Sequence, residues 1–350
     1  MSRLARKAGD LLLSVDDLHV TFPGQSRRES GTRAVDGVSF EVRAGEILAI
    51  VGESGCGKSA TALAVMGLHA RDTRVAGEIR FDGQPLTGRS ERDLSRVRGK
   101  QISMIFQDPL TALNPVVNVG RQITEVLERH EGMGRRQAND RAVELLRSVG
   151  IPDPGARLRD YPHQLSGGMR QRVMIAIAVA CNPHLLIADE PTTALDTTIQ
   201  AEILELILTL SRERAMALLL ITHDLGVVAQ TADQVAVMYA GRIVEQANRY
   251  EIFDHPRHRY TSGLLASTPT LAGEAHRRLT AIPGSAFDAK PWDDGCAFAP
   301  RCGFASSACL TPTLALEPTR AGHLLRCANP AGSAAKAIAD PPSTSPASRH

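Results

Sequence analysis

No hydrophobic run in this sequence is long enough to cross a membrane. The longest uninterrupted apolar segment, residues 173–181, has nine residues, about half of what a bilayer-spanning helix needs. A secretory signal peptide is also not expected, because the apolar segment 11–13 is too short to form its hydrophobic region. We therefore expect the chain to stay on the cytoplasmic side of the membrane.

The sequence also lacks a large net charge. It has 40 Lys and Arg residues against 38 Asp and Glu residues, so its formal net charge is only +2. A nucleic-acid-binding protein normally presents a strongly basic face, so the balanced charge argues against a nucleic-acid partner. The length of 350 residues and the hydrophobic content of 43% instead indicate an ordinary globular protein of about two domains.

Short apolar segments alternate with helical patterns through the central part of the chain. Strands are expected at 47–51, 78–82, 101–106, 185–188, 217–222 and 235–239, and helices at 60–68, 118–150, 169–181 and 197–214. This alternation is typical of a mostly parallel α/β sheet. Strand-like patterns at 11–22 and 38–42 predict an added antiparallel layer. After about residue 255 regular periodicity disappears.

The octapeptide GESGCGKS, which begins at Gly52, matches the phosphate-loop pattern G-x-x-x-x-G-K-S between an expected strand and an expected helix. Gly52, Gly55 and Gly57 allow backbone N–H groups to surround phosphate oxygens. We expect Lys58 to reach the β- and γ-phosphates of a nucleotide, and Ser59 to bind Mg²⁺. The flanking elements disfavour the alternative, a glycine-rich turn with a surface lysine.

Two carboxylates, Asp189 and Glu190, follow the apolar strand at 185–188. Asp189 at the end of the strand is suited to hold Mg²⁺, while Glu190 points elsewhere and is suited to act as a general base toward an attacking water. Acidic residues often end a strand that runs into a polar loop. The upstream phosphate loop favours the catalytic interpretation.

The heptapeptide LSGGMRQ at 165–171 lies between these two motifs. Together, the phosphate loop, this heptapeptide and the acid pair resemble the motifs of the ATP-binding-cassette (ABC) ATPases. The resemblance covers about residues 11–250. The resemblance implies that Ser166, Gly167 and Gly168 contact the γ-phosphate of an ATP held by a second ATPase subunit, so that two cassettes enclose two ATP molecules. Taken alone, the same residues fit a helix N-cap.

Four further residues match the family pattern. The resemblance implies that Gln107 is the Q-loop residue, near Mg²⁺ and the catalytic centre, and that Asp196 belongs to the D-loop. It also makes His223 the switch histidine and Phe22 the aromatic residue that stacks on adenine. Each has a structural alternative: Gln107 as a surface side chain, Asp196 as a helix N-cap, His223 as a histidine beside a helix, and Phe22 as a residue packed in its strand.

Three segments resemble the oligopeptide/dipeptide/nickel importer branch, and in particular its "D" ATPase subunit. They are FQDPLTALNPVVNVG at 106–120, IFDHPRHRYT at 252–261 and GCAFAPRCGFASSAC at 295–309. Arg259 stands where this branch usually has proline. The resemblance implies an ATPase subunit that powers peptide import; nickel or another small solute is the alternative, because other subunits select the solute.

Four of the six cysteines lie close together in the sequence: Cys296, Cys302, Cys309 and Cys327. No two of them form C-x-x-C, which is a poor match to common zinc sites. The resembling family implies a 4Fe–4S cluster here. Zinc and free thiols are the alternatives, since a cytoplasmic protein rarely forms stable disulfides. Cys56, inside the phosphate loop, is interpreted as a packing residue.

The expected architecture is a P-loop NTPase cassette with a RecA-like core, an antiparallel β layer and a helical subdomain. The expected divisions are an N-terminal tail (1–10), the nucleotide-binding domain (11–255) with its helical subdomain at about 107–170, a C-terminal extension (256–330) and a disordered tail rich in Ala, Pro and Ser (331–350).

The resemblance also implies the partners. They are two membrane-spanning permeases, a second ATPase subunit of the same or a related kind, and a solute-binding protein outside the membrane. The chain is then a peripheral protein on the cytoplasmic side of the inner membrane. A soluble, non-transport ABC protein that handles DNA or ribosomes is the rival interpretation. The sequence shows none of the long insertions such proteins usually carry, and its charge is balanced.

Overall fold

A small antiparallel sheet forms one layer of the molecule. The computed structural model describes residues 9–24, 31–192, 196–268, 281–285, 295–311, 314–320 and 322–332. The sheet has the order β2-β1-β4-β5 and is antiparallel throughout. Its strands are β1 (Leu11–Phe22), β2 (Thr32–Arg43), β4 (Arg74–Phe81) and β5 (Gln84–Pro85). The predicted antiparallel layer is confirmed, with β2 longer than the expected 38–42.

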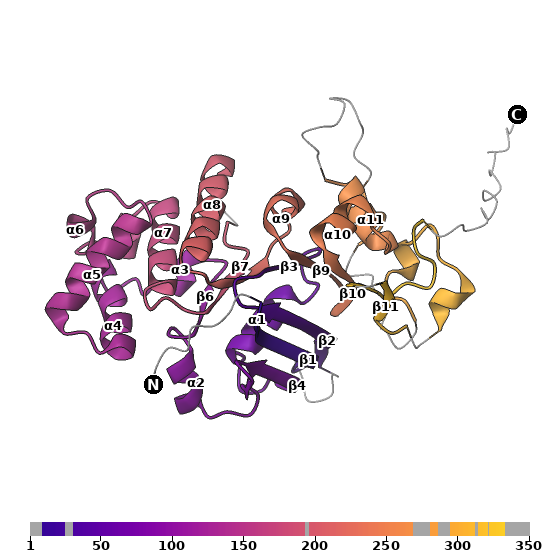
Figure 1. Ribbon diagram of the computed structural model, residues 1–350, viewed down its shortest axis with the longest axis horizontal. Coiled ribbons are helices and arrows are strands. Elements are labelled where there is room, and N and C mark those ends of the chain that lie inside the picture. Colours follow the sequence, from indigo (N-terminus) through magenta and orange to yellow (C-terminus); the bar gives the residue numbers. More distant parts are fainter. Residues whose placement is uncertain are drawn as a thin grey trace, which may run out of the picture.

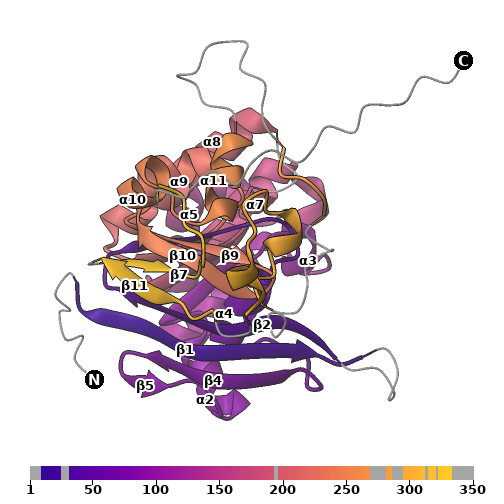
Figure 2. The ribbon, with the colours of Figure 1, turned by 90° about the vertical axis from the view of Figure 1, so that its right-hand side faces the viewer.

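A larger sheet runs through the centre of the molecule (Figures 1 and 2). Its order is β11-β12-β10-β9-β3-β8-β7-β6. The parallel strands are β6 (Ile102–Ile105), β7 (Leu185–Asp189), β8 (Ala217–Ile221), β3 (Ile47–Val51) and β9 (Gln234–Tyr239). Every residue of β3, β6, β7 and β8 is buried, as expected for parallel strands covered on both faces. The α/β prediction is confirmed.

The alternation of side chains along β3 divides the core in two. Leu48 and Ile50 pack on the side of the antiparallel sheet and of helix α1 (Lys58–Met66). Ile47, Ala49 and Val51 pack on the opposite side, with helices that include α8 (Thr197–Glu213) and α9 (Leu225–Thr231). Figure 2 shows the antiparallel strands below the large sheet and these helices above it.

A group of helices occupies one end of the molecule (Figure 1). Its members are α3 (Pro109–Ala112), α4 (Val119–Glu131), α5 (Arg135–Ser148), α6 (Pro154–Arg157) and α7 (Gly167–Ala178). The helical pattern expected from about 118 to 150 is confirmed as two helices: Gly132, whose φ of 67° is left-handed, caps the end of α4, and α5 begins after Gly134. Helix α2 (Glu91–Val97) lies outside this group, near β4.

The chain after residue 248 folds against the far edge of the large sheet. Helices α10 (Arg249–Asp254) and α11 (Arg259–Ala266) follow β10 (Arg242–Asn248), and β12 (His323–Leu325) pairs with β10 and with β11 (Glu317–Arg320). The expected loss of regular structure after residue 255 is therefore only partly right. The sheet continues across that boundary, and the domain division stays a prediction.

Buried Glu245 anchors this segment. Its carboxylate accepts hydrogen bonds from the backbone N–H groups of Arg257 (2.7 Å) and His258 (2.9 Å), and lies 2.8 Å from Nε2 of His323. Glu245 and His323 are both fully buried. One carboxylate thus joins β10, the start of α11 and β12.

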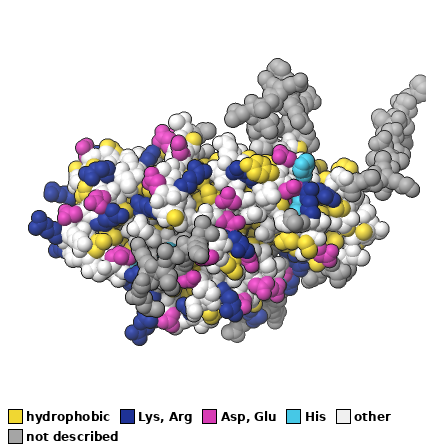
Figure 3. All heavy atoms as spheres, viewed as in Figure 1, with side chains coloured by type: hydrophobic (Ala, Val, Ile, Leu, Met, Phe, Trp, Pro, Cys, Tyr) yellow, Lys and Arg dark blue, Asp and Glu magenta, His cyan; other side chains and the backbone are white. Residues whose placement is uncertain are grey.

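On the face shown in Figure 3, basic and acidic side chains lie interspersed. In the described part of the chain, no helix has the length and hydropathy of a membrane span. The two predicted tails fall almost wholly outside the described residues.

Candidate nucleotide-binding site

The phosphate loop connects β3 to α1, and two of its glycines leave no room for a side chain. A Cβ atom at Gly52 would lie 2.2 Å from the carbonyl oxygen of Met238, and one at Gly57 would lie 2.3 Å from that of Ala34. Gly57 also has a left-handed φ of 106°. The loop therefore packs closely on the ends of β9 and β2. Cys56 is buried beneath it, in agreement with its interpretation as a packing residue.

Lys58 folds back across the loop. Its Nζ donates hydrogen bonds to the carbonyl oxygens of Gly52 and Glu53, both at 2.9 Å, and lies 3.8 Å from Oε1 of Glu190. The side chain is only 4% exposed, so the positive charge is held inside the loop rather than at the surface. The alternative of a surface lysine is wrong.

Ser59, at the start of α1, meets Asp189, at the end of β7. Ser59 Oγ donates a hydrogen bond of 2.9 Å to Oδ1 of Asp189. Burial raises the pKa of Asp189, the neighbouring Glu190 raises it further, and the Ser59 hydroxyl opposes the shift. A hydroxyl and a carboxylate are hard oxygen ligands, and Mg²⁺ favours such ligands. The two residues therefore fit the Mg²⁺ that the sequence predicts for them.

Three strand ends converge on Glu190. Gln107, just after β6, donates from Nε2 to Glu190 Oε2 at 3.3 Å, and Nδ1 of His223, just after β8, lies 3.7 Å from the same oxygen. Because β6, β7 and β8 are adjacent and parallel, their carboxyl ends share one edge of the sheet, where ligands of such sheets bind. The structure thus brings Gln107, Glu190, His223 and Lys58 together.

Glu190 occupies a strained backbone position. Its φ is 43°, in the left-handed region that a non-glycine residue rarely adopts, and its N–H donates to Ile221 O at 2.9 Å. Such strain is found most often at functional sites. Asp189 and Glu190 contact different groups although they are neighbours: Asp189 accepts from Ser59, whereas Glu190 faces Gln107 and His223.

Ser166 caps helix α7. Its Oγ accepts a hydrogen bond of 3.3 Å from the Met169 N–H, and both Ser166 and Gly167 are exposed. A Cβ at Gly168 would lie 3.2 Å from Ile199 of α8. Within the described residues, no hydrogen bond joins these three residues to the phosphate loop of the same chain. The N-cap alternative is right about the local structure and leaves the outward-facing atoms free for a partner.

The two remaining predicted site residues lie at the ends of other elements, Asp196 before α8 and Phe22 at the end of β1. Asp196 is at the N-cap position of α8, but its side chain makes no capping hydrogen bond, so the expected cap is only positional. Its D-loop neighbours at 193–195 lie outside the described residues. Phe22 ends β1 with 36% of its surface exposed, and its ring meets His69 edge to face, with centroids 6.1 Å apart.

Two residues to which the sequence analysis gave no role touch the phosphate loop. The Glu53 N–H donates to Oη of Tyr260 at 2.8 Å, and Arg301 donates to both carboxylate oxygens of Glu53, at 2.6 and 2.9 Å. Tyr260 and Arg301 lie in segments that resemble the importer branch. Nothing in those segments pointed to a loop more than 200 residues earlier in the chain.

The four late cysteines lie near one another. Cys296 N–H donates to Cys309 O at 2.8 Å. Burial raises the pKa of Cys296 to about 11, and its three neighbouring cysteines add to the shift. All six cysteines are free thiols. Over the described ranges, no three His, Cys, Asp or Glu side chains form a group that could hold a metal ion.

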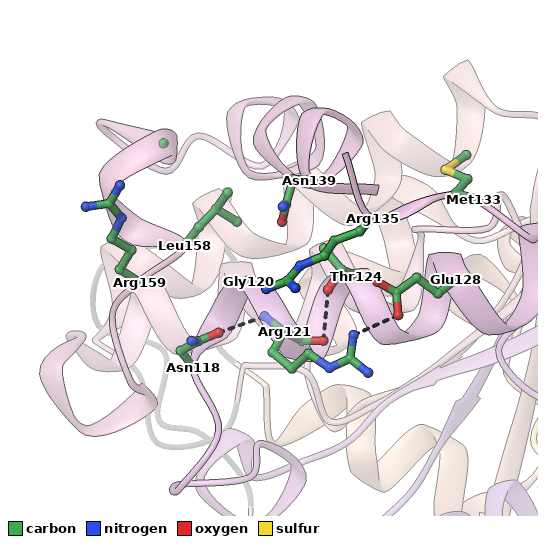
Figure 4. A pocket seen from close by; sticks show the side chains of 11 residues that line it. Asn118, Gly120, Arg121, Thr124, Glu128, Met133, Arg135, Asn139, Leu158 and Arg159 are labelled. Carbon is green, nitrogen blue, oxygen red and sulfur yellow. Dashed lines mark hydrogen bonds and ion pairs between the residues drawn. The ribbon is translucent and has the colours of Figure 1, made fainter. Parts of the chain in front are cut away.

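A hollow of about 1160 Å³ lies within the helical end of the molecule, between α4, α5 and α6 (Figure 4). Arg121 on its rim donates to Glu128 at 2.7 Å. None of the residues that line it belongs to the phosphate loop or to the strand ends around Glu190. This hollow is therefore separate from the candidate nucleotide site.

Comparison with known proteins agrees with this geometry. Residues 35–193 match the family described as ABC transporter, and residues 244–309 match the oligopeptide/dipeptide transporter C-terminal region. The chain is 52% identical over 320 residues to the "Probable peptide ABC transporter ATP-binding protein y4tR" of Sinorhizobium fredii, covering 91% of this chain and 95% of that protein. It is 49% identical to the "Oligopeptide transport ATP-binding protein AppD" of Bacillus subtilis (90% and 96% covered). It is 48% identical to the "Dipeptide transport ATP-binding protein DppD" of Escherichia coli (91% and 97% covered).

Solved structures share the cassette fold. The ATP-binding cassette MJ0796, in a dimeric post-hydrolysis state bound to ADP and Pi, aligns with a TM-score of 0.61 and 26% identity over 68% of this chain and 99% of that one. The cbiO1 protein of Clostridium perfringens, part of the transporter complex cbiONQ, aligns with a TM-score of 0.58 and 29% identity over 70% and 92%. Together with the full-length relatives, these matches show that the chain is an ATP-hydrolysing member of the ABC transporter ATP-binding proteins, in the branch that carries the oligopeptide/dipeptide transporter C-terminal region.

Proposed function

We propose that this chain powers the import of oligopeptides or dipeptides through a membrane transporter by hydrolysing ATP. The single observation that carries the proposal is the match of residues 244–309 to the oligopeptide/dipeptide transporter C-terminal region, joined in one chain to an ATPase cassette. The relatives named for peptide, oligopeptide or dipeptide transport cover nine-tenths or more of this chain at about half identity and support it.

The proposed chemistry uses the residues that converge on Glu190. Lys58 exchanges its contacts with the Gly52 and Glu53 carbonyl oxygens for phosphate oxygens of ATP. Glu190 accepts a proton from the attacking water, while Gln107 and His223, at 3.3 and 3.7 Å, hold the carboxylate in place. Ser59, Asp189 and Gln107 would hold Mg²⁺, which neutralises charge on the phosphates when bound.

The exposed signature residues point to a second subunit. Ser166, Gly167 and Gly168 make no hydrogen bond to their own phosphate loop within the described chain. They lie at a helix N-terminus, where backbone N–H groups favour an anion. We assign them to the γ-phosphate of ATP on a second ATPase subunit, with Asp196 at the same junction. Phe22, partly exposed at the end of β1, is assigned to adenine.

Permease docking is assigned to the surface beside Gln107. Leu110 in α3 and Val116 in the loop after it are 59% and 79% exposed, so both apolar side chains are accessible to a protein partner. Two permeases bound at such surfaces would hold the ATPase pair at the cytoplasmic side of the inner membrane, with a solute-binding protein on the other side. The charge balance gives no role to nucleic acid.

A transport assay tests the proposal. Cells that lack this chain receive the wild-type gene or the Glu190→Gln variant, and uptake of a labelled dipeptide, a labelled pentapeptide and ⁶³Ni²⁺ is measured. The proposal expects peptide uptake to return with the wild type only. Restored nickel uptake without peptide uptake would support the alternative solute, and no restored uptake of any kind would contradict an importer role.

The 4Fe–4S cluster predicted for Cys296, Cys302, Cys309 and Cys327, with zinc as its alternative, does not fit the described geometry. Among the described residues no three Cys, His, Asp or Glu side chains form a group that could hold a metal ion, and no step of the proposed chemistry involves one. The sequence prediction keeps its own test, the iron, sulfide and zinc content of anaerobically purified protein. About four irons per chain, lost in Cys302→Ser, would support it, and a chain without metal would overturn it.

A further inference from the structure

The C-terminal extension reaches the phosphate loop at one residue, Glu53. Glu53 is the second residue of the loop, and three of its groups are engaged at once. Its N–H donates to Tyr260 Oη (2.8 Å), its carboxylate receives both terminal nitrogens of Arg301 (2.6 and 2.9 Å), and its carbonyl oxygen accepts from Lys58 Nζ (2.9 Å). The same residue therefore connects the extension to the lysine that the phosphate loop uses.

Arg301 is held so that its guanidinium cannot easily turn away. It lies in the short 3₁₀ segment Ala299–Arg301, its side chain is 4% exposed, and its Nε donates to the carbonyl oxygen of Pro283 at 2.7 Å. The guanidinium carbon lies 5.8 and 5.9 Å from the ring centres of Tyr239 and Phe298. A planar guanidinium in this setting binds a carboxylate through two parallel hydrogen bonds, which fixes both distance and orientation.

Tyr260 connects the same extension to the sheet. Its ring is fully buried, with its centre 4.7 Å from that of Tyr239 in β9 and 5.4 Å from that of Phe298. Strand β9 lies beside β3, which leads into the phosphate loop. Burial raises the pKa of Tyr260, so its hydroxyl is neutral and accepts the Glu53 N–H. Figure 1 shows α11 and the C-terminal segment next to β9 and β10.

The charge of the Glu53–Arg301 pair matters because the phosphate loop that carries Glu53 is proposed to bind a nucleotide. Without Arg301, the Glu53 carboxylate would be an uncompensated anion on the loop that holds a polyanionic nucleotide. It would also be free to compete with phosphate for Lys58, whose Nζ already touches the Glu53 carbonyl oxygen. Arg301 is 4% exposed and Glu53 26% exposed, so removing Arg301 leaves a half-buried carboxylate without its counterion.

We propose that Tyr260 and Arg301 are positioning residues for nucleotide binding: together they brace the phosphate loop through Glu53, so that the C-terminal extension sets the affinity of the loop for ATP. The inference rests on the proposed role of that loop. Because coupling between two sites is reciprocal, nucleotide binding in turn stabilises the docked extension.

The test measures Mg·ADP affinity by isothermal titration calorimetry on the full chain, with the KM and kcat of ATP hydrolysis alongside. Arg301→Gln is expected to raise the dissociation constant and the KM about fivefold or more, with little change in kcat. Adding Glu53→Gln to it removes the unpaired charge and is expected to recover most of the affinity. Tyr260→Phe keeps the ring and is expected to give a smaller loss.

Arg259→Gln is the matched control. Arg259 lies in α11 beside Tyr260, but its hydrogen bonds go to the carbonyl oxygens of Asn329 and Pro330, at 3.0 and 3.1 Å, and not to the loop. An equal loss of affinity in Arg259→Gln would mean that any disturbance of the C-terminal extension weakens nucleotide binding. That result would overturn the proposed role of Tyr260 and Arg301. Unchanged affinity in both Arg301→Gln and Tyr260→Phe would overturn it as well.

Lys58→Ala separates this inference from the proposed function. If that variant binds Mg·ADP as tightly as the wild type, the assignment of the phosphate loop itself fails. If it loses binding while Arg301→Gln and Tyr260→Phe do not, only the brace is wrong. Should Arg301→Gln fail to fold, Tyr260→Phe decides the matter, since it removes one oxygen and keeps the packing of the ring.

Discussion

Nε2 of Gln107 lies 3.3 Å from Oε2 of Glu190, although the two residues are 83 positions apart. They meet because β6 and β7 are parallel neighbours, and the two residues lie within two positions of the ends of their strands. His223 reaches the same oxygen from the end of β8. The arrangement around Glu190 is thus a product of strand order: side chains far apart in the sequence meet at the carboxyl edge of the sheet.

Gln107→Ala and His223→Ala are expected to slow hydrolysis more than they weaken binding. Each removes a neighbour of the Glu190 carboxylate, so we expect kcat to fall about 100-fold or more in each variant, with a small change in KM. Steady-state ATPase kinetics measure both constants. A large rise in KM at unchanged kcat would mean that these residues bind ATP and do not position the base.

Ser59→Ala is expected to weaken the affinity of the ATPase for magnesium. The variant loses the hydroxyl that donates to Asp189 at 2.9 Å. We expect the Mg²⁺ concentration for half-maximal hydrolysis to rise about tenfold or more, because a small change in the ligand shell costs at least that in metal affinity. Ser54→Ala, an exposed serine of the same loop, is the control. An equal shift in both variants would contradict the assignment.

Buried His258 predicts a loss of stability in acid. Burial lowers its pKa to about 3, while Nδ1 accepts the Tyr260 N–H at 3.1 Å. Between pH 6.5 and 3 the unfolded chain therefore binds a proton that the folded chain does not, so stability falls as the pH falls. From the ordinary histidine pKa, this one group costs about 2 kcal/mol at pH 5.

His258→Asn tests that sign. Asparagine keeps a side-chain acceptor at the N-cap of α11 but does not titrate. The midpoint of thermal unfolding should fall less between pH 7.5 and pH 5 in this variant than in the wild type. His255→Asn changes an exposed histidine in the same segment and should leave the wild-type dependence unchanged. Parallel curves for all three proteins would show that His258 does not control the acid loss.

The parts of the site that could be predicted from the sequence are those written in short contiguous motifs. Lys58 and Ser59 stand in the phosphate-loop pattern, and Glu190 follows an apolar strand downstream of it, so these short motifs predicted them. The strand order then brings them together. The contacts of Tyr260 and Arg301 with Glu53 could not be predicted, because the two residues are 207 and 248 positions away from it and their segments have no periodic pattern.

Local errors in the predicted elements also have physical causes. The helical pattern from about 118 to 150 did not show where one helix ends: Gly132 and Gly134 each cost a helix interior about 1 kcal/mol, and the chain ends α4 before the first and begins α5 after the second. Helix α11 was missed because it has only eight residues and follows a His-Arg-rich loop. Its position depends on contacts of Glu245 and the late strands, which local sequence does not reveal.

The measurement that tests the account most directly is ATP binding and turnover by Glu190→Gln. The amide keeps the size of the side chain and removes its ability to accept a proton. Binding of Mg·ATP, measured by calorimetry, is expected to stay near the wild-type affinity, while turnover is expected to fall about 100-fold or more. Hydrolysis near the wild-type rate in a folded variant that binds ATP would contradict the assignment of Glu190 as the base.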